Sequence, residues 1–175
     1  MFFDIHLYHQ AGIDLAQKHK TRTAVRAVII DKSQIILAFL QKNNEFKFPG
    51  GGVEINETLE DALRREVKEE IGAKLKLIKR KLGIVTEYDN QNESENEYFK
   101  MESHYFEVEI ENEFEKQELD DYEKELDFIL KKISIKDAYE INRNTMEHGR
   151  NKTKWIKRET LVLGKLEEIM KSEIG

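Results

Sequence analysis

A proline-glycine loop followed by a capped helix constrains the fold of this chain more than any other feature. Pro49 is the only proline, and three consecutive glycines, Gly50 to Gly52, follow it directly. Such a run is costly in conformational entropy unless the backbone needs unusual angles or close contact with another group. Thr58 with Asp61 three residues later is a capping-box pattern, and Gly72 is a typical helix terminator. The sequence therefore predicts a tight loop and then a helix from about Thr58 to the residue before Gly72.

Three glutamates of this helix, Glu66, Glu69 and Glu70, fall on its apolar side or at the edge of that side. At about 100° per residue, the apolar arc is formed by Leu59, Ala62, Leu63, Val67 and Ile71. Buried carboxylates are costly unless they are paired or bound to a cation, and carboxylates at i, i+3 and i+4 meet at one spot. Hard oxygen ligands without cysteine or histidine suit Mg²⁺, with Mn²⁺ as a substitute. The alternative is a solvated acidic helix stabilised by i,i+4 ion pairs.

The segment from Gly51 to Ala73 reads GGVEINETLEDALRREVKEEIGA. Its spacing resembles the Nudix box, and the preceding Phe48-Pro49-Gly50 resembles the lead-in of that family. The matching positions are Gly51, Glu57, Arg65, Glu66, Glu69, Glu70 and Gly72. Two positions depart from the pattern, because Asn56 stands where glycine is frequent and Ala73 where a larger aliphatic residue is frequent.

The resemblance to the Nudix hydrolase superfamily implies an α/β (α+β) fold, a Nudix-type α-β-α sandwich around a mixed β-sheet. It also implies a magnesium-dependent enzyme that cleaves a phosphoanhydride bond in a nucleoside diphosphate linked to another moiety. The implied metal ligands are Glu66, Glu69, Glu70 and the carbonyl of Gly50. Glu57 would support the site, and Arg65 would orient Glu57 or Glu69 through a salt bridge. A plain turn at Gly50 and a free surface arginine are the alternatives.

The rest of the pattern predicts mixed strands and helices in one domain, residues 1–175. Two apolar runs separated by Lys32-Ser33-Gln34 are typical of a β-hairpin. Ser134 with Asp137 could open a further helix, and the C-terminus has helical spacing of apolar residues. The expected strands are Thr21 to Asp31, Ile35 to Leu40, Phe46 to Phe48, Leu75 to Glu87, Met101 to Ile110 and Phe128 to Leu130.

Three further residues leave two interpretations each. Glu123, in an acidic stretch, most resembles the additional carboxylate that the family recruits from a later loop as metal ligand or base, but a solvated loop is equally compatible. Arg26 interrupts an apolar strand, so it faces either the substrate phosphates or the sheet edge. Trp155 could stack on a base, although an anchor of the C-terminal helix is favoured.

Composition and charge narrow the class of protein. A net charge of −6 argues against general nucleic-acid binding, which needs clustered Lys and Arg. The chain has no cysteine, no signal-peptide pattern and no apolar run long enough to span a bilayer. We therefore expect a cytoplasmic protein that does not bind membranes, with a small nucleotide-like molecule as its partner, and we leave a homodimer open.

The substrate is less constrained than the reaction. Subfamilies that cleave ADP-ribose usually carry a proline some fifteen residues beyond the box, and this chain has no proline after Pro49. That absence weakly disfavours ADP-ribose. A module that senses a nucleotide without turnover is the alternative function, although such modules often lose carboxylates that this box retains.

Overall fold

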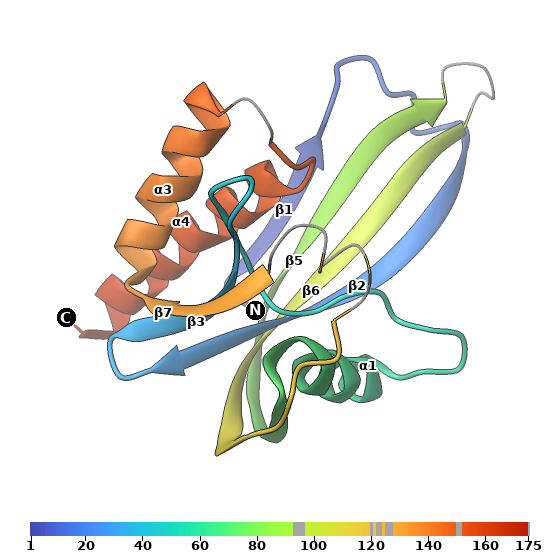
Figure 1. Cartoon of the computed structure of the whole chain (residues 1–175). Helices are drawn as coiled ribbons and strands as arrows, with labels where there is room; N and C mark the ends of the chain where they lie inside the picture. Colours follow the sequence, from blue (N-terminus) through green and yellow to red (C-terminus); the bar gives the residue numbers. More distant parts are fainter. Residues whose placement is uncertain (93–96, 120, 122–123, 125–127, 150–151, 175) are drawn as a thin grey trace.

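The computed structural model of the 175-residue chain describes residues 1–92, 97–119, 121, 124, 128–149 and 152–174 (Figure 1). Its centre is a mixed β-sheet in the order β1-β5-β6-β2-β3-β4, with β7 paired to β3. The strands are β1 (Phe3–Tyr8), β2 (Lys18–Asp31), β3 (Gln34–Leu40), β4 (Glu45–Lys47), β5 (Ala73–Asn92), β6 (Glu97–Phe114) and β7 (Phe128–Ile133). The helices are α1 (Leu59–Glu66), continued by a π-helical turn (Val67–Ile71), α3 (Ile135–His148) and α4 (Ile156–Ile174).

Two strand pairs are parallel and the others are antiparallel. β1 runs parallel to β5, and β2 runs parallel to β6. β2 and β3 form the expected hairpin, with Asp31 opposite Gln34. β5 and β6 are longer than the sequence indicated and form an extended antiparallel ribbon with several register shifts.

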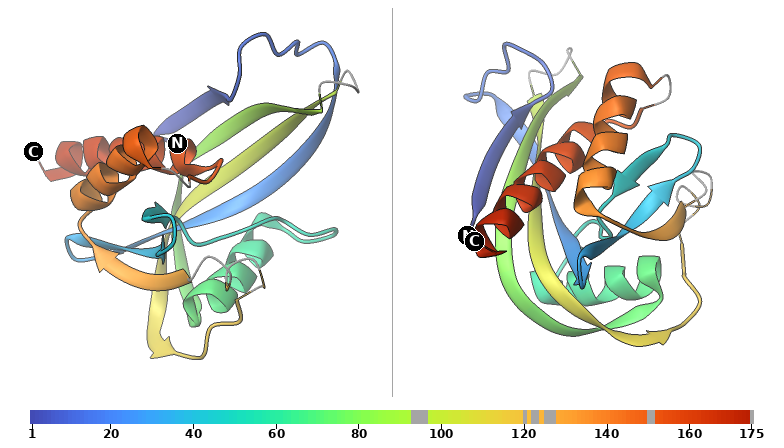
Figure 2. Two further views of the ribbon diagram at one scale, coloured as in Figure 1. Left: turned by 45° about the horizontal axis from the view of Figure 1, so that its top comes forward. Right: turned by 90° about the vertical axis from the view of Figure 1, so that its left-hand side faces the viewer.

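Helices cover both faces of the sheet (Figure 2). The buried apolar side of α1 packs on Val25, Ala27 and Ile29 of β2. On the opposite face, Val162, Leu163 and Leu166 of α4 and Ala138 of α3 pack into a second core. The α-β-α sandwich around a mixed sheet, predicted from the resemblance, is confirmed. Within the described part of the chain, no helix is long and apolar enough to cross a membrane.

β1 is a strand that the sequence analysis did not predict. Phe3, Ile5 and Leu7 alternate with more polar residues, and Phe3 and Leu7 are buried, so a period-two signal was present. The partner could not be inferred in the same way, because Phe3 pairs with Gly83, 80 positions later. The N-terminal segment therefore adds an edge strand to the sheet.

The box helix begins and ends as its caps predict. The Thr58 hydroxyl accepts from the Asp61 N–H at 3.1 Å, and the Asp61 carboxylate accepts from Thr58 in return. Gly72 ends the helix in the left-handed region at φ 71°. The last turn, Val67–Ile71, is π-helical, which a fixed step of about 100° per residue could not predict. Single π turns in helices are frequent at functional sites.

Gly72 provides a test of this helix ending. An added Cβ would meet the backbone carbonyl of Glu115, whereas Gly12 has a similar φ of +81° with nothing within 4 Å. Gly12→Ala should lower the free energy of unfolding by about 1–2 kcal/mol, the cost of a left-handed residue with a side chain. Gly72→Ala should cost about 1–3 kcal/mol more because of the steric overlap. Urea unfolding followed by circular dichroism measures both, and equal losses would contradict the packing at Gly72.

Candidate active site

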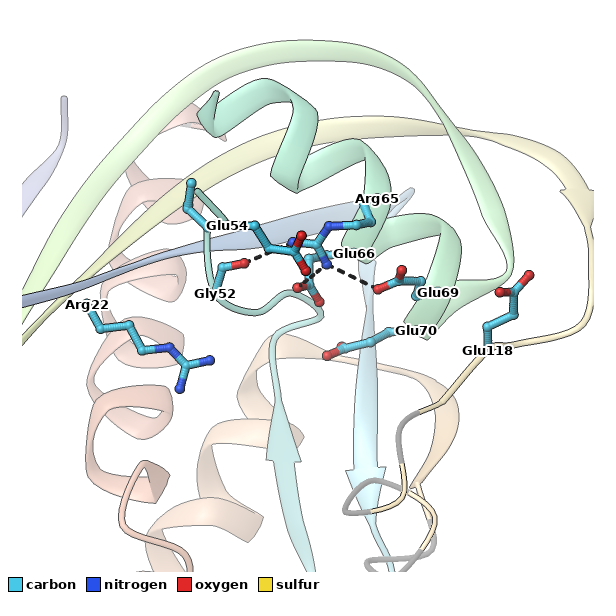
Figure 3. A pocket seen from close by; sticks show the side chains of 9 residues that line it. Arg22, Gly52, Glu54, Arg65, Glu66, Glu69, Glu70 and Glu118 are labelled. Atoms are coloured by element: carbon cyan, nitrogen blue, oxygen red, sulfur yellow. Dashed lines mark hydrogen bonds and ion pairs between the residues drawn. The ribbon is translucent and has the colours of Figure 1, made fainter. Parts of the chain in front are cut away.

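Two adjoining hollows lie where the glycine loop, the box helix and β2 meet. The smaller has a volume of about 340 Å³ and is lined mainly by charged side chains (Figure 3). Its lining residues are Arg22, Gly52, Val53, Glu54, Arg65, Glu66, Glu69, Glu70 and Glu118. The larger is a cleft of about 660 Å³ that shares Arg22, Gly52, Glu66 and Glu70 with the first. The box carboxylates therefore stand at the junction of the two.

Backbone hydrogen bonds hold the glycine loop flat against β2. The amides of Val25 and Ala27 donate to the carbonyls of Gly51 and Pro49 at 3.0 and 2.8 Å. Gly50 has φ +132°, and a Cβ there would strike the Val25 carbonyl. The predicted need for glycine at this loop thus has a backbone cause at Gly50. Asn56, which departs from the family pattern, adopts φ 67°, a conformation that asparagine tolerates better than most residues.

Arg65 connects the loop to three box carboxylates. Its guanidinium donates to both carboxylate oxygens of Glu57 at 2.9 Å, to Glu66 at 2.7 Å and to Glu69 at 3.2 Å. It also donates to the Gly52 carbonyl at 2.9 Å. The hydrogen bond from Arg65 lowers the pKa of the Glu57 carboxyl. Arg65 thus forms salt bridges with both Glu57 and Glu69, where the sequence analysis expected one or the other, and Glu57 does not line the smaller hollow.

Glu66 and Glu70 are buried, whereas Glu69 is partly exposed. Burial raises the pKa of the Glu66 carboxyl, although Arg65 acts in the opposite direction. Glu70 is 3% exposed and accepts from the Lys47 ammonium at 2.9 Å and from the Gly50 amide at 3.0 Å. The desolvation cost of burying Glu66 and Glu70 is therefore offset by cations of the protein, Arg65 for Glu66 and Lys47 for Glu70.

The donor chemistry of the smaller hollow suits a hard divalent cation. Five carboxylates line it, from Glu54, Glu66, Glu69, Glu70 and Glu118, against the two guanidiniums of Arg22 and Arg65. Across the residues that the structure describes, however, no three acidic or histidine side chains form a ready-made metal cluster. Arg65 and Lys47 hold the carboxylates separately, so a metal ion would have to draw them together.

The position of Arg26 rules out one of the two interpretations of the sequence, the sheet edge, and leaves contact with the substrate phosphates as a prediction. Its side chain is only 4% exposed, and β2 lies between β6 and β3, so it does not lie at a sheet edge. The guanidinium donates to the carbonyl of Gly50 and also lines the larger cleft. The Gly50 carbonyl, predicted as a metal ligand, thus accepts from Arg26 in this structure. Burial, together with the nearby charge of Arg158, lowers the pKa of Arg26.

Glu123 lies outside the described residues. From the same acidic stretch, Glu118 reaches the smaller hollow, and its amide donates to the Glu69 carbonyl at 2.8 Å. Many acidic residues in one stretch gave no signal to choose among them.

Three further lining residues, Arg22, Lys47 and Glu54, were missed. Lys47 had a weak signal, as a cation between Phe46 and Phe48 in a strand that proved buried. Arg22 has no carboxylate partner among the residues described, and its guanidinium packs against Gly52. The period-two pattern places Arg22 on the same face of β2 as Arg26, which could have identified it.

Comparison with known proteins identifies the family of this chain. The sequence model of the NUDIX domain matches residues 20–159. The chain belongs to the NUDIX domain family. An ADP-ribose pyrophosphatase of Methanocaldococcus jannaschii is 46% identical over 65 residues, which is 35% of this chain and 38% of that protein. The match thus spans well under half of that relative.

Two solved structures are similar to this NUDIX chain, and of these only the one with a TM-score above 0.5 supports the fold. An ADP compounds hydrolase has a TM-score of 0.51 at 18% identity, over 87% of this chain and 74% of that one. The E. coli ORF135 protein has a TM-score of 0.48 at 22% identity, over 74% of this chain and 83% of that one.

Gly51 and Gly52 lie against different side chains of the site, so an alanine at each position displaces a different one. A Cβ at Gly51 would lie 2.7 Å from the Glu66 carboxyl carbon, and one at Gly52 would lie 2.7 Å from an Arg22 nitrogen. Both neighbours are ends of flexible side chains, so Gly51→Ala and Gly52→Ala should change the free energy of unfolding by less than about 1 kcal/mol. Only Gly51→Ala should weaken Mn²⁺ binding, because it displaces a carboxylate. Electron paramagnetic resonance titration of Mn²⁺ measures this, and equal affinity in both variants would contradict it.

Proposed function

We propose that this chain is a Mg²⁺-dependent hydrolase that cleaves a phosphoanhydride bond in a nucleoside diphosphate linked to another moiety. One observation carries the proposal: the box carboxylates line a hollow that opens into a cleft large enough for a small-molecule ligand. Arg22, Arg26 and Lys47 bring positive charge to the same cleft. An anionic phosphate group is the ligand that this combination favours.

In this proposal Glu66, Glu69, Glu70 and the Gly50 carbonyl hold the metal, with Mn²⁺ as a substitute for Mg²⁺. Bound there, the ion would neutralise charge on the pyrophosphate and lower the pKa of the attacking water. Arg65 keeps Glu57, Glu66 and Glu69 in place through its fork of hydrogen bonds. Arg26 fixes the Gly50 carbonyl by a hydrogen bond and also lines the cleft, so its contact with the substrate phosphates is part of the proposal.

Arg22 is the residue that we assign to the substrate phosphates. Its guanidinium lines both hollows and has no carboxylate partner in the described part of the chain. A planar guanidinium binds phosphate oxygens in bidentate fashion. Because the other cations of the site are held by carboxylates or carbonyls, Arg22 can engage a ligand at the lowest cost.

The proton of the attacking water needs an acceptor. We propose Glu118 for this role as an alternative to Glu123. Glu118 lines the hollow together with the box carboxylates, as Figure 3 shows. A base that reaches from a separate loop can contribute roughly 10²–10⁴-fold to a rate. Comparison of Glu118→Gln with Glu123→Gln, by maximal rate and pH profile, would assign the role.

The substrate panel should begin with ADP-ribose. The relative from Methanocaldococcus jannaschii is named for that substrate, which weighs against the inference from the missing proline. UDP-sugars, nucleoside triphosphates and other capped diphosphates complete the panel, tested with Mg²⁺ and with Mn²⁺.

A nucleotide-sensing module is the second candidate, since Arg65 and Lys47 already pair the carboxylates. Binding without turnover across the panel would favour it. Two predictions about the whole protein stay untested: it is cytoplasmic, and it has no general affinity for nucleic acids. Whether it forms a homodimer stays open.

Replacing a box carboxylate tests the metal assignment. Glu69→Gln should lower turnover by roughly 10²-fold or more, because a ligand and its charge are lost. Glu69 is partly exposed, so its replacement should leave the fold intact by circular dichroism. Glu70→Gln should lose at least as much turnover, but it leaves Lys47 buried without this carboxylate partner, which destabilises. Near-normal turnover in a folded Glu69→Gln variant would contradict the assignment of Glu69 as a metal ligand.

Arg22→Ala tests the phosphate contact. The variant should raise the Michaelis constant by about 10–100-fold, the loss of a charged hydrogen bond of about 1.5–3 kcal/mol. Lys20→Ala is the matched control: it removes a cation two residues earlier on the same strand, and the Lys20 side chain is 76% exposed beside Glu97. Steady-state kinetics on the best substrate measure both Michaelis constants. Equal increases in the two variants would show that Arg22 contributes only general surface charge.

A further inference from the structure

The outer edge of β1 is a strand edge that the NUDIX match does not include. β1 lies at the end of the strand order, and among the described strands it pairs with β5 alone. It precedes residue 20, where the match begins. Figure 2 shows β1 at the margin of the sheet. An edge strand presents a row of N–H and C=O groups that can pair with a further strand.

Asp4 and His6 present these backbone groups to the outside. The His9 amide donates to the Tyr88 carbonyl at 3.0 Å, and Tyr8 is the register partner of Tyr88. Backbone groups of successive residues point to opposite sides of a strand, so the odd-numbered residues of β1 bond to β5. The even-numbered residues therefore direct their N–H and C=O groups to the outer edge.

Exposed apolar side chains gather near this edge. Among the residues that the structure describes, seven large apolar side chains are exposed, and four of them belong to the first 15 residues, namely Met1, Phe2, Tyr8 and Leu15. Single exposed apolar residues are normal on a protein surface, whereas a concentration of them marks an interaction site. Phe2 is held beside β1, because its amide donates to the Leu82 carbonyl at 2.7 Å.

Two exposed side chains of β1 are complementary to each other. The side chains of Asp4 and His6 are 55% and 53% exposed, and the His6 Nε2 lies 3.8 Å from an Asp4 carboxylate oxygen. The His6 ring is held by Tyr88, which stacks on it and bonds to Nδ1 at 3.0 Å. Charges of one sign would repel a second copy of the strand. A carboxylate and an imidazole two residues apart instead match an antiparallel copy of themselves.

This complementarity selects one register for such a pair. Because even-numbered residues face outward, the registers with most overlap place Asp4 opposite Asp4, His6 opposite His6, or Asp4 opposite His6. The first two bring like groups together, which costs stability, and the third forms two favourable cross-strand pairs. An imidazole N–H can donate to a carboxylate whether or not the ring is charged. In the third register Ile5 lies opposite itself, and Phe2 lies opposite Tyr8.

We propose that this chain forms a homodimer in which β1 pairs antiparallel with β1 of a second copy, about a two-fold axis at Ile5. The same patch serves on both copies, as a two-fold interface requires. Asp4 of each copy accepts a hydrogen bond from His6 of the second copy, and the rings of Phe2 and Tyr8 meet at both ends of the pair. β1 has six residues, so the interface is small and the association weak. The dimer does not depend on the proposed hydrolase activity.

Cysteine cross-links can establish the register, because the chain has no cysteine of its own. Antiparallel partners that are not hydrogen-bonded have Cα atoms about 4.5 Å apart, within the range of a disulfide. Ile5→Cys should therefore form a covalent dimer of the full chain under mild oxidation. Tyr8→Cys is the matched control, since its two copies would lie about 20 Å apart along the paired strands. Non-reducing electrophoresis measures both, and cross-linking at Tyr8 as efficient as at Ile5 would overturn the register.

Sedimentation equilibrium tests the dimer and its charge pairs. The unmodified chain should associate reversibly between about 1 and 500 μM. His6→Asp sets carboxylates opposite each other at both places, so it should raise the dimer Kd by roughly 4–30-fold. Adding Asp4→Lys to His6→Asp restores opposite charges and should return the Kd to within about 3-fold of the original. His19→Asp makes the same substitution at an exposed residue of β2 and should have no effect.

The outcomes decide between a dimer edge and a strand that stays unpaired. A chain that remains monomeric at about 500 μM, a folded Ile5→Cys variant that does not cross-link, or a His6→Asp variant that associates as well as His19→Asp would each overturn the proposal. Restored association in the double variant would support it. Circular dichroism checks that each variant is folded. Turnover on the substrate panel is measured separately, so failure of the hydrolase would leave the dimer standing.

Discussion

The Arg65 guanidinium is the interaction on which the arrangement of the site depends. One planar group links the loop carbonyl of Gly52 with carboxylates from Glu57, Glu66 and Glu69. Carboxylates this close repel each other, and burial adds a desolvation cost that an arginine fork offsets better than a lysine could. The loop and the helix are therefore held together by charge as well as by packing, and backbone hydrogen bonds join the loop to β2.

The parts of the fold that could be predicted are those with local causes. The cap at Thr58, the left-handed Gly72 and the hairpin between β2 and β3 depend on residues within a few positions of each other. The parallel partners of β1 and β2 depend on pairings some 80 positions apart, for which one sequence carries no signal. The π turn also escaped prediction, because a periodicity argument assumes one angle per residue throughout the helix.

The candidate site was predictable to a similar extent. Box residues on one helix face were found because their spacing is regular, and the ion pair of Arg65 with Glu69 follows from that spacing. The ion pair with Glu57, which precedes the helix, was expected only from the resemblance to the family. Arg22 and Lys47 reach the same hollows from strands, where a single cation gives no pattern. Arg26 shows the limit most clearly. A cation in an apolar strand needs a partner, but its partner is a loop carbonyl that only the folded backbone brings near.

The two parallel strand pairs delay sheet formation during synthesis, because each first strand must wait for its partner to be made. Phe3 meets Gly83 and Lys18 meets Glu97, so about 80 residues separate each strand from its partner, or about 4–16 s at a ribosomal rate of about 5–20 residues per second. During that interval β2 has a long unpaired edge that could pair with another nascent chain. Its first residues include Lys18, Lys20 and Arg22, and charges at a waiting edge oppose such pairing. The arginine that we assign to substrate phosphates would thus also protect the chain before its site exists.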